Sequence, residues 1–153
     1  MKYKGDILKQ KKGYTAVELL VVVSILIFIV TLITVSITGI RQRSRDATRL
    51  NHINTIRKAF DLYLTATSEG YPASIGECLV DSSPAGMTLI SADAVKNIPK
   101  DPVWPSAMPG TTEGFCYYYI SDGYDAYTLD YFLETTKHTG KKGWHQASDK
   151  NLY

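Results

Sequence analysis

The hydrophobic positions of this 153-residue chain are concentrated in one block near the N-terminus. The 22 residues from Leu19 to Ile40 include no charged side chain, and most of them are Leu, Val, Ile or Phe. As a helix, this block spans roughly 33 Å at about 1.5 Å per residue, enough to cross a hydrocarbon core of about 30 Å. The alternative, a buried core helix of this length, requires a far larger protein around it. We therefore predict a membrane-spanning helix.

Basic residues flank this block on both sides. Residues 1–13 contain five lysines and one aspartate, which favours a cytoplasmic N-terminus. Four arginines follow within residues 41–49, so that charge alone leaves the orientation open. A secretory signal peptide has a shorter apolar region and a small-residue cleavage site after it, and this block has neither. Any processing is therefore expected on the cytoplasmic side, where Gly13 precedes Tyr14.

The helical pattern continues beyond Gly39 but becomes amphipathic. Apolar residues then recur at intervals of three and four, which is typical of one helix face: Leu50, Ile53, Ile56, Phe60, Tyr63 and Leu64. No proline occurs before Pro72 and Gly70 is a suitable C-cap, so we predict one helix from about Tyr14 to Glu69, with a bend allowed at Gly39.

The charged residues of this segment are expected mainly off the apolar face. The arginines at 41, 43, 45 and 49 are most simply a solvated helix face, although lipid headgroups, DNA or acidic residues of another chain are alternative partners. They lack interleaved aromatic residues, so no specific nucleic-acid site is predicted.

The rest of the chain predicts a small head with loops and an antiparallel hairpin. All six prolines lie between Pro72 and Pro109, so this stretch is expected to be mostly loop, with a short helix or turn near 92–96 and a brief strand at 87–90. Strands at 115–120 and 124–134 are predicted to pair through a turn that contains Asp122-Gly123.

The second predicted strand alternates between two faces, so one face is expected to pack on the amphipathic helix. Six of the eleven tyrosines lie between Tyr117 and Tyr131. We attribute them to strand propensity, with hydroxyl groups in water at the sheet edge, although an adhesive surface is the alternative. Residues 135–153 are expected to form a polar tail anchored by Trp144.

The two cysteines, Cys78 and Cys116, lie outside the cytoplasm in this topology. A disulfide between them would join the loop to the first hairpin strand, and free buried thiols are the alternative. Their spacing fits no CxxC metal or redox motif, and the three histidines show no paired-ligand spacing. Because nucleotide-binding and nucleophile motifs are also missing from the sequence, we predict no enzymatic activity and no cofactor.

Glu18 is a charged residue at the very start of the apolar block. An ionised carboxylate in hydrocarbon is costly, so such a residue is usually paired or functional. The alternative is that Glu18 only marks the membrane interface, because residues 19–40 can span the membrane without it. Cleavage after Gly13 would supply a partner, the α-amino group of Tyr14, whose reference pKa of about 8 keeps it largely positive at neutral pH.

The segment KKGYTAVELLVVV, residues 11–23, resembles the N-terminus of a type IV prepilin or pseudopilin. The resemblance implies that a prepilin peptidase cuts after Gly13, that Tyr14 is N-methylated, and that Glu18 supports assembly. The chain departs from the family in having Tyr14 where phenylalanine is usual. It also has Ile27 and Val35 where the family often has helix-loosening glycine or proline.

The resemblance also implies an α+β fold, with a long N-terminal helix packed against a small antiparallel β-sheet head. Residues 97–102 are similar to a proline-containing loop segment of major pilins and pseudopilins, and we interpret their role as structural. Some secretion pseudopilins hold calcium in a C-terminal loop, which makes Asp122, Asp125 and Asp130 weak calcium candidates; their spacing is not that of an EF-hand.

The domain prediction is a leader (1–13), a transmembrane and filament-core helix (14–40), an amphipathic head helix (41–70), a globular head (71–134) and a polar tail (135–153). We expect a structural subunit of a type IV pilus or pilus-like filament, held in the inner membrane as a precursor. Its partners would be identical or homologous subunits, the peptidase, an inner-membrane assembly platform and membrane lipid. The alternatives are a secretion-system pseudopilin of a short periplasmic filament and, in another class, a membrane-anchored receptor or binding protein.

Overall fold

The structure, a computed structural model, describes residues 13–107 and 114–151, without the side chains of residues 33–36. The predicted leader lies outside the described residues except for Gly13. Two compact units make up the chain, Met1–Thr38 and Gly39–Tyr153, and each is described by itself.

Helix α1 spans Ala16–Thr67, so the prediction of one long helix is confirmed to within two residues at each end. It begins after Thr15, whose Oγ1 accepts a hydrogen bond from the backbone N–H of Glu18 at 3.2 Å. It ends where Ser68 adopts the left-handed conformation with φ 56°. The predicted C-cap, Gly70, follows two residues later, also at positive φ, where the backbone of Tyr124 packs too closely to admit a side chain.

In the first unit, the apolar part of α1 is not buried at all. By length and composition, α1 is the one helix in the described part of the chain that is suited to cross a membrane, and none of its most apolar stretch is covered by the protein. A core helix of a water-soluble protein would be mostly buried. This N-terminal part is therefore compatible with a single-pass anchor.

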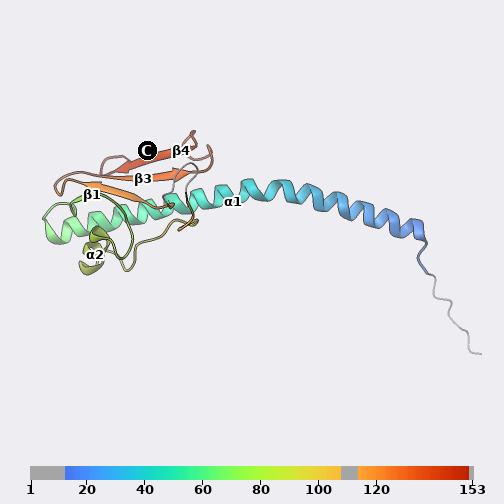
Figure 1. Cartoon of the computed structure of the whole chain (residues 1–153), viewed down its shortest axis with the longest axis horizontal. Coiled ribbons are helices and arrows are strands. Elements are labelled where there is room, and N and C mark those ends of the chain that lie inside the picture. The colour runs from blue at the N-terminus through green and yellow to red at the C-terminus, as the bar shows by residue number, and fades with distance from the viewer. Residues whose placement is uncertain (1–12, 108–113, 152–153) are drawn as a thin grey trace, which may run out of the picture. The chain divides into compact units, whose positions relative to one another are not determined.

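In the second unit, the C-terminal part of α1 packs against a four-stranded antiparallel sheet (Figure 1). The strands lie in the order β1-β2-β3-β4 and span Ser74–Cys78, Tyr118–Ser121, Tyr127–Leu133 and Gly143–Ser148. A short helix, α2, spans Pro84–Ser91 between β1 and β2. This head unit thus has an α+β fold.

The predicted hairpin is confirmed, with shorter strands than expected. Strands β2 and β3 pair in register from Tyr118 with Asp130 to Ser121 with Tyr127. The turn between them contains Gly123 at φ 86°, a conformation that favours glycine.

Two other predictions about the head are wrong, and a third is confirmed. Residues 87–90 are helical rather than a strand, because Ser83 caps α2 by accepting from the N–H of Gly86 and Pro84 opens its first turn. Residues 92–96 contain a turn, which confirms the prediction of a short helix or turn there. The predicted polar tail forms β4, which pairs with β3 through six residue pairs and is held by backbone hydrogen bonds more than by burial, since only Ala147 is buried in it.

The core lies between the apolar face of α1 and the inner face of the sheet. Phe60 stacks on Tyr119 with ring centroids 4.7 Å apart and also contacts Tyr127 at 4.7 Å. The predicted alternation of β3 is confirmed, because every second residue from Tyr127 to Leu133 is buried. The expectation that the tyrosine hydroxyl groups lie in water is wrong for Tyr117, Tyr119, Tyr127 and Tyr131, which are buried.

Candidate functional site

The three residues to which the sequence pattern drew attention, Gly13, Tyr14 and Glu18, lie just before α1 and in its first turn. Tyr14 is 85% exposed, and Glu18 is the one acidic residue of the first helical turn. Tyr14 and Glu18 line a shallow, mostly apolar hollow together with Leu19 and Val22. The three predicted residues are therefore accessible to a peptidase and to another chain.

Glu18 also has a local role that the sequence analysis missed. Thr15 is the N-cap of α1 and Glu18 is its N3 residue, which is the Thr-x-x-Glu pattern of a capping box. A carboxylate in the first turn is also favoured by the positive end of the helix dipole. Glu18 therefore has two separable properties, its place in the cap and its charge.

Gly13 has no steric reason to be glycine in this structure. A Cβ atom added at Gly13 would meet nothing within 4 Å, and its φ is not in the left-handed region. The fold of the chain therefore does not require glycine at this position, and any such requirement has to come from another molecule that binds here.

The head contains a buried cluster of charges around Arg49, which is 0% exposed. Its Nε and Nη2 donate to the two carboxylate oxygens of Asp101 at 2.7 and 3.1 Å. Its Nη1 donates to Asp46 at 3.0 Å and to Glu134 at 2.7 Å, and the guanidinium lies over the ring of Phe115 at 5.2 Å. One side chain of α1 thus joins the 97–102 loop and the end of β3.

The acidic members of this cluster have further donors. Asp46, also 0% exposed, accepts from the backbone N–H groups of Glu134 and Thr135 at 2.9 and 2.8 Å and from the Thr135 hydroxyl at 2.7 Å. Glu134 pairs with Arg45 as well. Paired and hydrogen-bonded in this way, the buried charges are compensated.

The electrostatics of the cluster favour the charged forms of Glu134 and Arg49. Hydrogen bonding from Arg45 lowers the pKa of Glu134, with a further contribution from Arg49, although partial burial opposes this. Burial alone would lower the pKa of Arg49, but its hydrogen bonds and charge interactions with Asp101 and Glu134 outweigh burial and raise it. Nearby, burial lowers the pKa of His52, whose Nδ1 lies 2.9 Å from the Tyr117 hydroxyl.

The prediction that the 41–49 arginines form a solvated face is therefore wrong for half of them. Arg49 is buried and Arg45 is half-buried, whereas Arg41 and Arg43 are exposed. The spacing along the helix could have indicated this burial, because Arg49 lies four residues before Ile53 and Asp46 lies three residues before Arg49. These charges continue the apolar face of the helix, and at that point acidic partners from the 97–102 loop and from the end of β3 reach the face.

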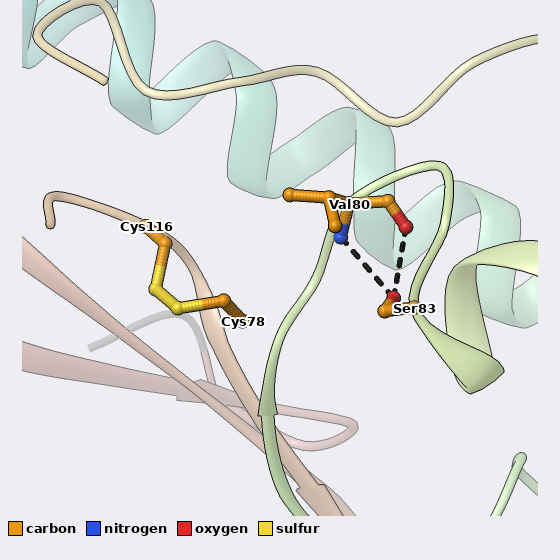
Figure 2. The surroundings of a disulfide bond; sticks show 4 residues. All are labelled: Cys78, Val80, Ser83 and Cys116. Carbon is orange, nitrogen blue, oxygen red and sulfur yellow. Dashed lines mark hydrogen bonds between the residues drawn. A yellow bond between two sulfur atoms is a disulfide. The ribbon is translucent and has the colours of Figure 1, made fainter. Parts of the chain in front are cut away.

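The disulfide between Cys78 and Cys116 is present, with a Cα–Cα distance of 5.6 Å (Figure 2). It joins the end of β1 to the segment before β2, close to the turn in which the Ser83 hydroxyl bonds to both backbone groups of Val80. Closing a loop of 38 positions contributes about 3–4 kcal/mol in the chain-entropy model. The bond therefore secures the α2 region of the head.

The calcium candidates are not brought together as a ligand set. Asp122 accepts from the backbone N–H of Tyr124 at 3.0 Å, Asp130 accepts from the Gln146 amide at 2.9 Å, and Asp125 is exposed. Among the described residues, no group of three or more His, Cys, Asp or Glu is arranged to hold a metal ion.

Comparisons of this chain with protein-family models, with curated proteins and with solved structures found no match in any of the three.

Proposed function

We propose that this chain is a structural subunit of a type IV pilus or a pilus-like filament, made as a precursor, cut after Gly13 and assembled through its N-terminal helix. The observation that carries the proposal is the exposure of the most apolar stretch of α1. An apolar surface of this size has to be covered by lipid or by other protein. A filament subunit needs both coverings in turn, lipid before assembly and neighbouring helices afterwards.

The residues at the start of α1 support the same proposal. Cleavage after Gly13 would place a new amine at Tyr14, within one helical turn of Glu18. A carboxylate and an amine held among apolar helices attract each other strongly because little water screens them. A Glu18 of one subunit that pairs with the Tyr14 amine of another would set the axial register of the bundle.

The first experiment is intact-mass analysis of the protein from its native host. The proposal expects a chain that begins at Tyr14 and is one methyl group heavier than the unmodified peptide. The variant Gly13→Val should keep the full N-terminus, and the structure gives no folding reason for it to fail otherwise. A wild-type chain that still begins at Met1 would point to a membrane-anchored receptor or binding protein and overturn the proposal.

The second experiment separates the two properties of Glu18. Glu18→Gln keeps a residue that suits the capping box but removes the charge, whereas Thr15→Ala removes the cap and keeps the charge. If the charge assembles the filament, Glu18→Gln abolishes sheared or periplasmic filaments and Thr15→Ala, which costs the helix only about 1 kcal/mol, leaves them. Normal filament yield from Glu18→Gln would refute the pairing role.

The two filament types differ in length, so shearing distinguishes them. Long surface pili are released into the medium by shear, whereas a short periplasmic filament of a secretion pseudopilin is not.

A further inference from the structure

Exposed acidic residues of the head unit gather at one end of its sheet, and exposed basic residues gather at the other. The separation is incomplete, because Lys58 lies three residues before Asp61 on α1 and Lys150 follows the end of β4 that pairs with the start of β3. At one end, the C-terminus of α1 meets the β2–β3 turn, where the N–H of Tyr71 donates to the carbonyl of Tyr124 at 3.1 Å. Four exposed acidic residues lie around this contact, and we call them the acidic end: Asp61, Glu69, Asp122 and Asp125. Burial raises the pKa of Tyr71 most; the nearby carboxylates of Asp61, Asp149 and Asp125 raise it further, whereas the charge of Arg57 lowers it.

At the opposite end of the sheet, exposed residues of the other sign gather. Here β3 ends beside the first turns of the head part of α1, since Asp46 binds the backbone of Glu134 and Thr135. Five exposed basic residues lie on α1 and on the β3–β4 loop, and we call them the basic end: Arg41, Arg43, Lys137, Lys141 and Lys142. Figure 1 shows the two connections, residues 122–126 and 134–142, at opposite ends of the strands.

The buried cluster is the reason why the basic end is unbalanced. Three carboxylates lie at this end, those of Asp46, Asp101 and Glu134, and all three are bound by Arg45 or Arg49. The five residues of the basic end form no ion pair with any described residue, nor do the four of the acidic end. Along α1, Arg41 and Asp61 are separated by 20 residues, or about 30 Å. The head therefore has two unpaired poles.

We propose that successive copies of this chain dock head to tail, with the acidic end of one head against the basic end of the next. This inference rests on the proposed filament function and names its head-to-head contact surface. A basic end alone would equally fit an anionic lipid or a nucleic acid. The same molecule, however, carries a group of acidic residues at its other end, and a second copy offers a match to both ends.

The geometry of the contact suits a filament. Two different patches on one molecule make a heterologous contact, which produces a ring or an open helical array. Complementary charge fixes orientation because the like-charged arrangements repel. Tyr124, 71% exposed between Asp122 and Asp125, adds an aromatic ring that can pack on a lysine of the next copy.

Site-specific crosslinking in the full-length chain tests the contact. Both native cysteines are used in the Cys78–Cys116 disulfide, so an introduced cysteine is the single free thiol. Ala126→Cys marks the acidic end and Thr136→Cys marks the basic end, at exposed positions that carry no charge. Differently tagged chains are co-expressed in the native host. We expect Ala126→Cys chains to crosslink to Thr136→Cys chains in preference to their own kind, and a majority of like pairs would overturn the proposal.

Charge reversal then tests the cause of the contact. Asp122→Lys with Asp125→Lys, or Lys141→Glu with Lys142→Glu, should lower the mixed crosslink by about two- to fivefold for each pair lost. Chains with reversed acidic ends should recover the crosslink with chains that have reversed basic ends. The control Lys96→Glu reverses one exposed charge that belongs to neither end, and it should leave the crosslink yield unchanged. Equal losses in this control, or no recovery in the swapped pair, would overturn the proposal.

The intact mass of the same samples separates this inference from the proposed function. Chains that are cut at Tyr14 and form filaments, but give no mixed crosslink, would refute the head-to-tail contact alone. Chains that begin at Met1 would refute the filament function.

Discussion

The substitution Arg49→Met tests whether one buried arginine holds the head together. Methionine keeps most of the volume of the aliphatic stem but removes all four hydrogen bonds to Asp46, Asp101 and Glu134. Asp46 keeps three donors from the two residues that follow β3, and Glu134 keeps Arg45. Among the described residues, Asp101 keeps only the N–H of Val103 at 2.9 Å as a side-chain partner. The main cost is therefore the stranded, buried carboxylate of Asp101.

Removing one partner of a buried ion pair typically costs about 3–5 kcal/mol. That is a large part of the about 5–15 kcal/mol by which a domain is usually stable. With a slope of about 1.5 kcal/mol per molar urea, the unfolding midpoint should fall by about 2–3 M. The assay is urea unfolding of the full chain in detergent micelles, followed by near-ultraviolet circular dichroism of the head.

Two further variants isolate the cause. Arg57→Met makes the same substitution about two turns further along α1. The Arg57 side chain is half-buried and donates one long hydrogen bond, 3.4 Å, to the carbonyl of Asp149, so this variant should lower the free energy of unfolding by less than about 1 kcal/mol. Arg49→Met combined with Asp101→Asn removes the stranded charge and should recover about 1–3 kcal/mol. An Arg49→Met variant as stable as Arg57→Met, or a double variant with no recovery, would refute this account of the cluster.

Two other predictions concern the tyrosines and the pH dependence of the head. The Tyr127 hydroxyl is buried without a hydrogen-bond partner in the described structure, and burial raises its pKa to about 12, whereas the Tyr119 hydroxyl donates to a backbone carbonyl at 2.7 Å. Tyr127→Phe should therefore be neutral or stabilising and Tyr119→Phe should cost about 1 kcal/mol in urea unfolding; the reverse order would contradict the assignment. Hydrogen bonding from Arg45, helped by Arg49, lowers the pKa of Glu134 in the folded head. Ionised Glu134 therefore stabilises the head fully above its pKa in the unfolded chain, about 4.3, and this contribution is lost as the pH falls through its lower pKa in the folded head. Urea midpoints below about pH 4.5 should fall less steeply in Glu134→Gln than in the wild type, and equal slopes would contradict the linkage.

Local patterns predicted the elements whose cause is local. The apolar block and the three-to-four periodicity extend over many turns, so α1 was predictable almost to its ends. The Asp-Gly turn between alternating strands likewise predicted the β2–β3 hairpin. The short segment at 87–90, three apolar residues and a threonine, fits a strand or a helix equally, and the Ser83 cap decides for the helix.

Other elements depend on a partner far away in the sequence. Strand β4 is polar and has little propensity of its own, and it forms because β3 offers an unpaired backbone edge. The buried cluster depends on Asp101 and Glu134, which lie 52 and 85 positions after Arg49. In the sequence, an arginine that is paired with distant acids looks the same as one in water.

The sequence alone determined the apolar anchor, the position of Gly13, Tyr14 and Glu18 ahead of it, and the packing face of the head helix, because each is a matter of composition or of spacing along one element. Tertiary structure alone decided which charges are buried and which remain on the surface. Burial of an ion depends on whether opposite charges and hydrogen-bond donors converge on it in space, and in this chain they come from a loop and a strand end that only the fold brings to α1.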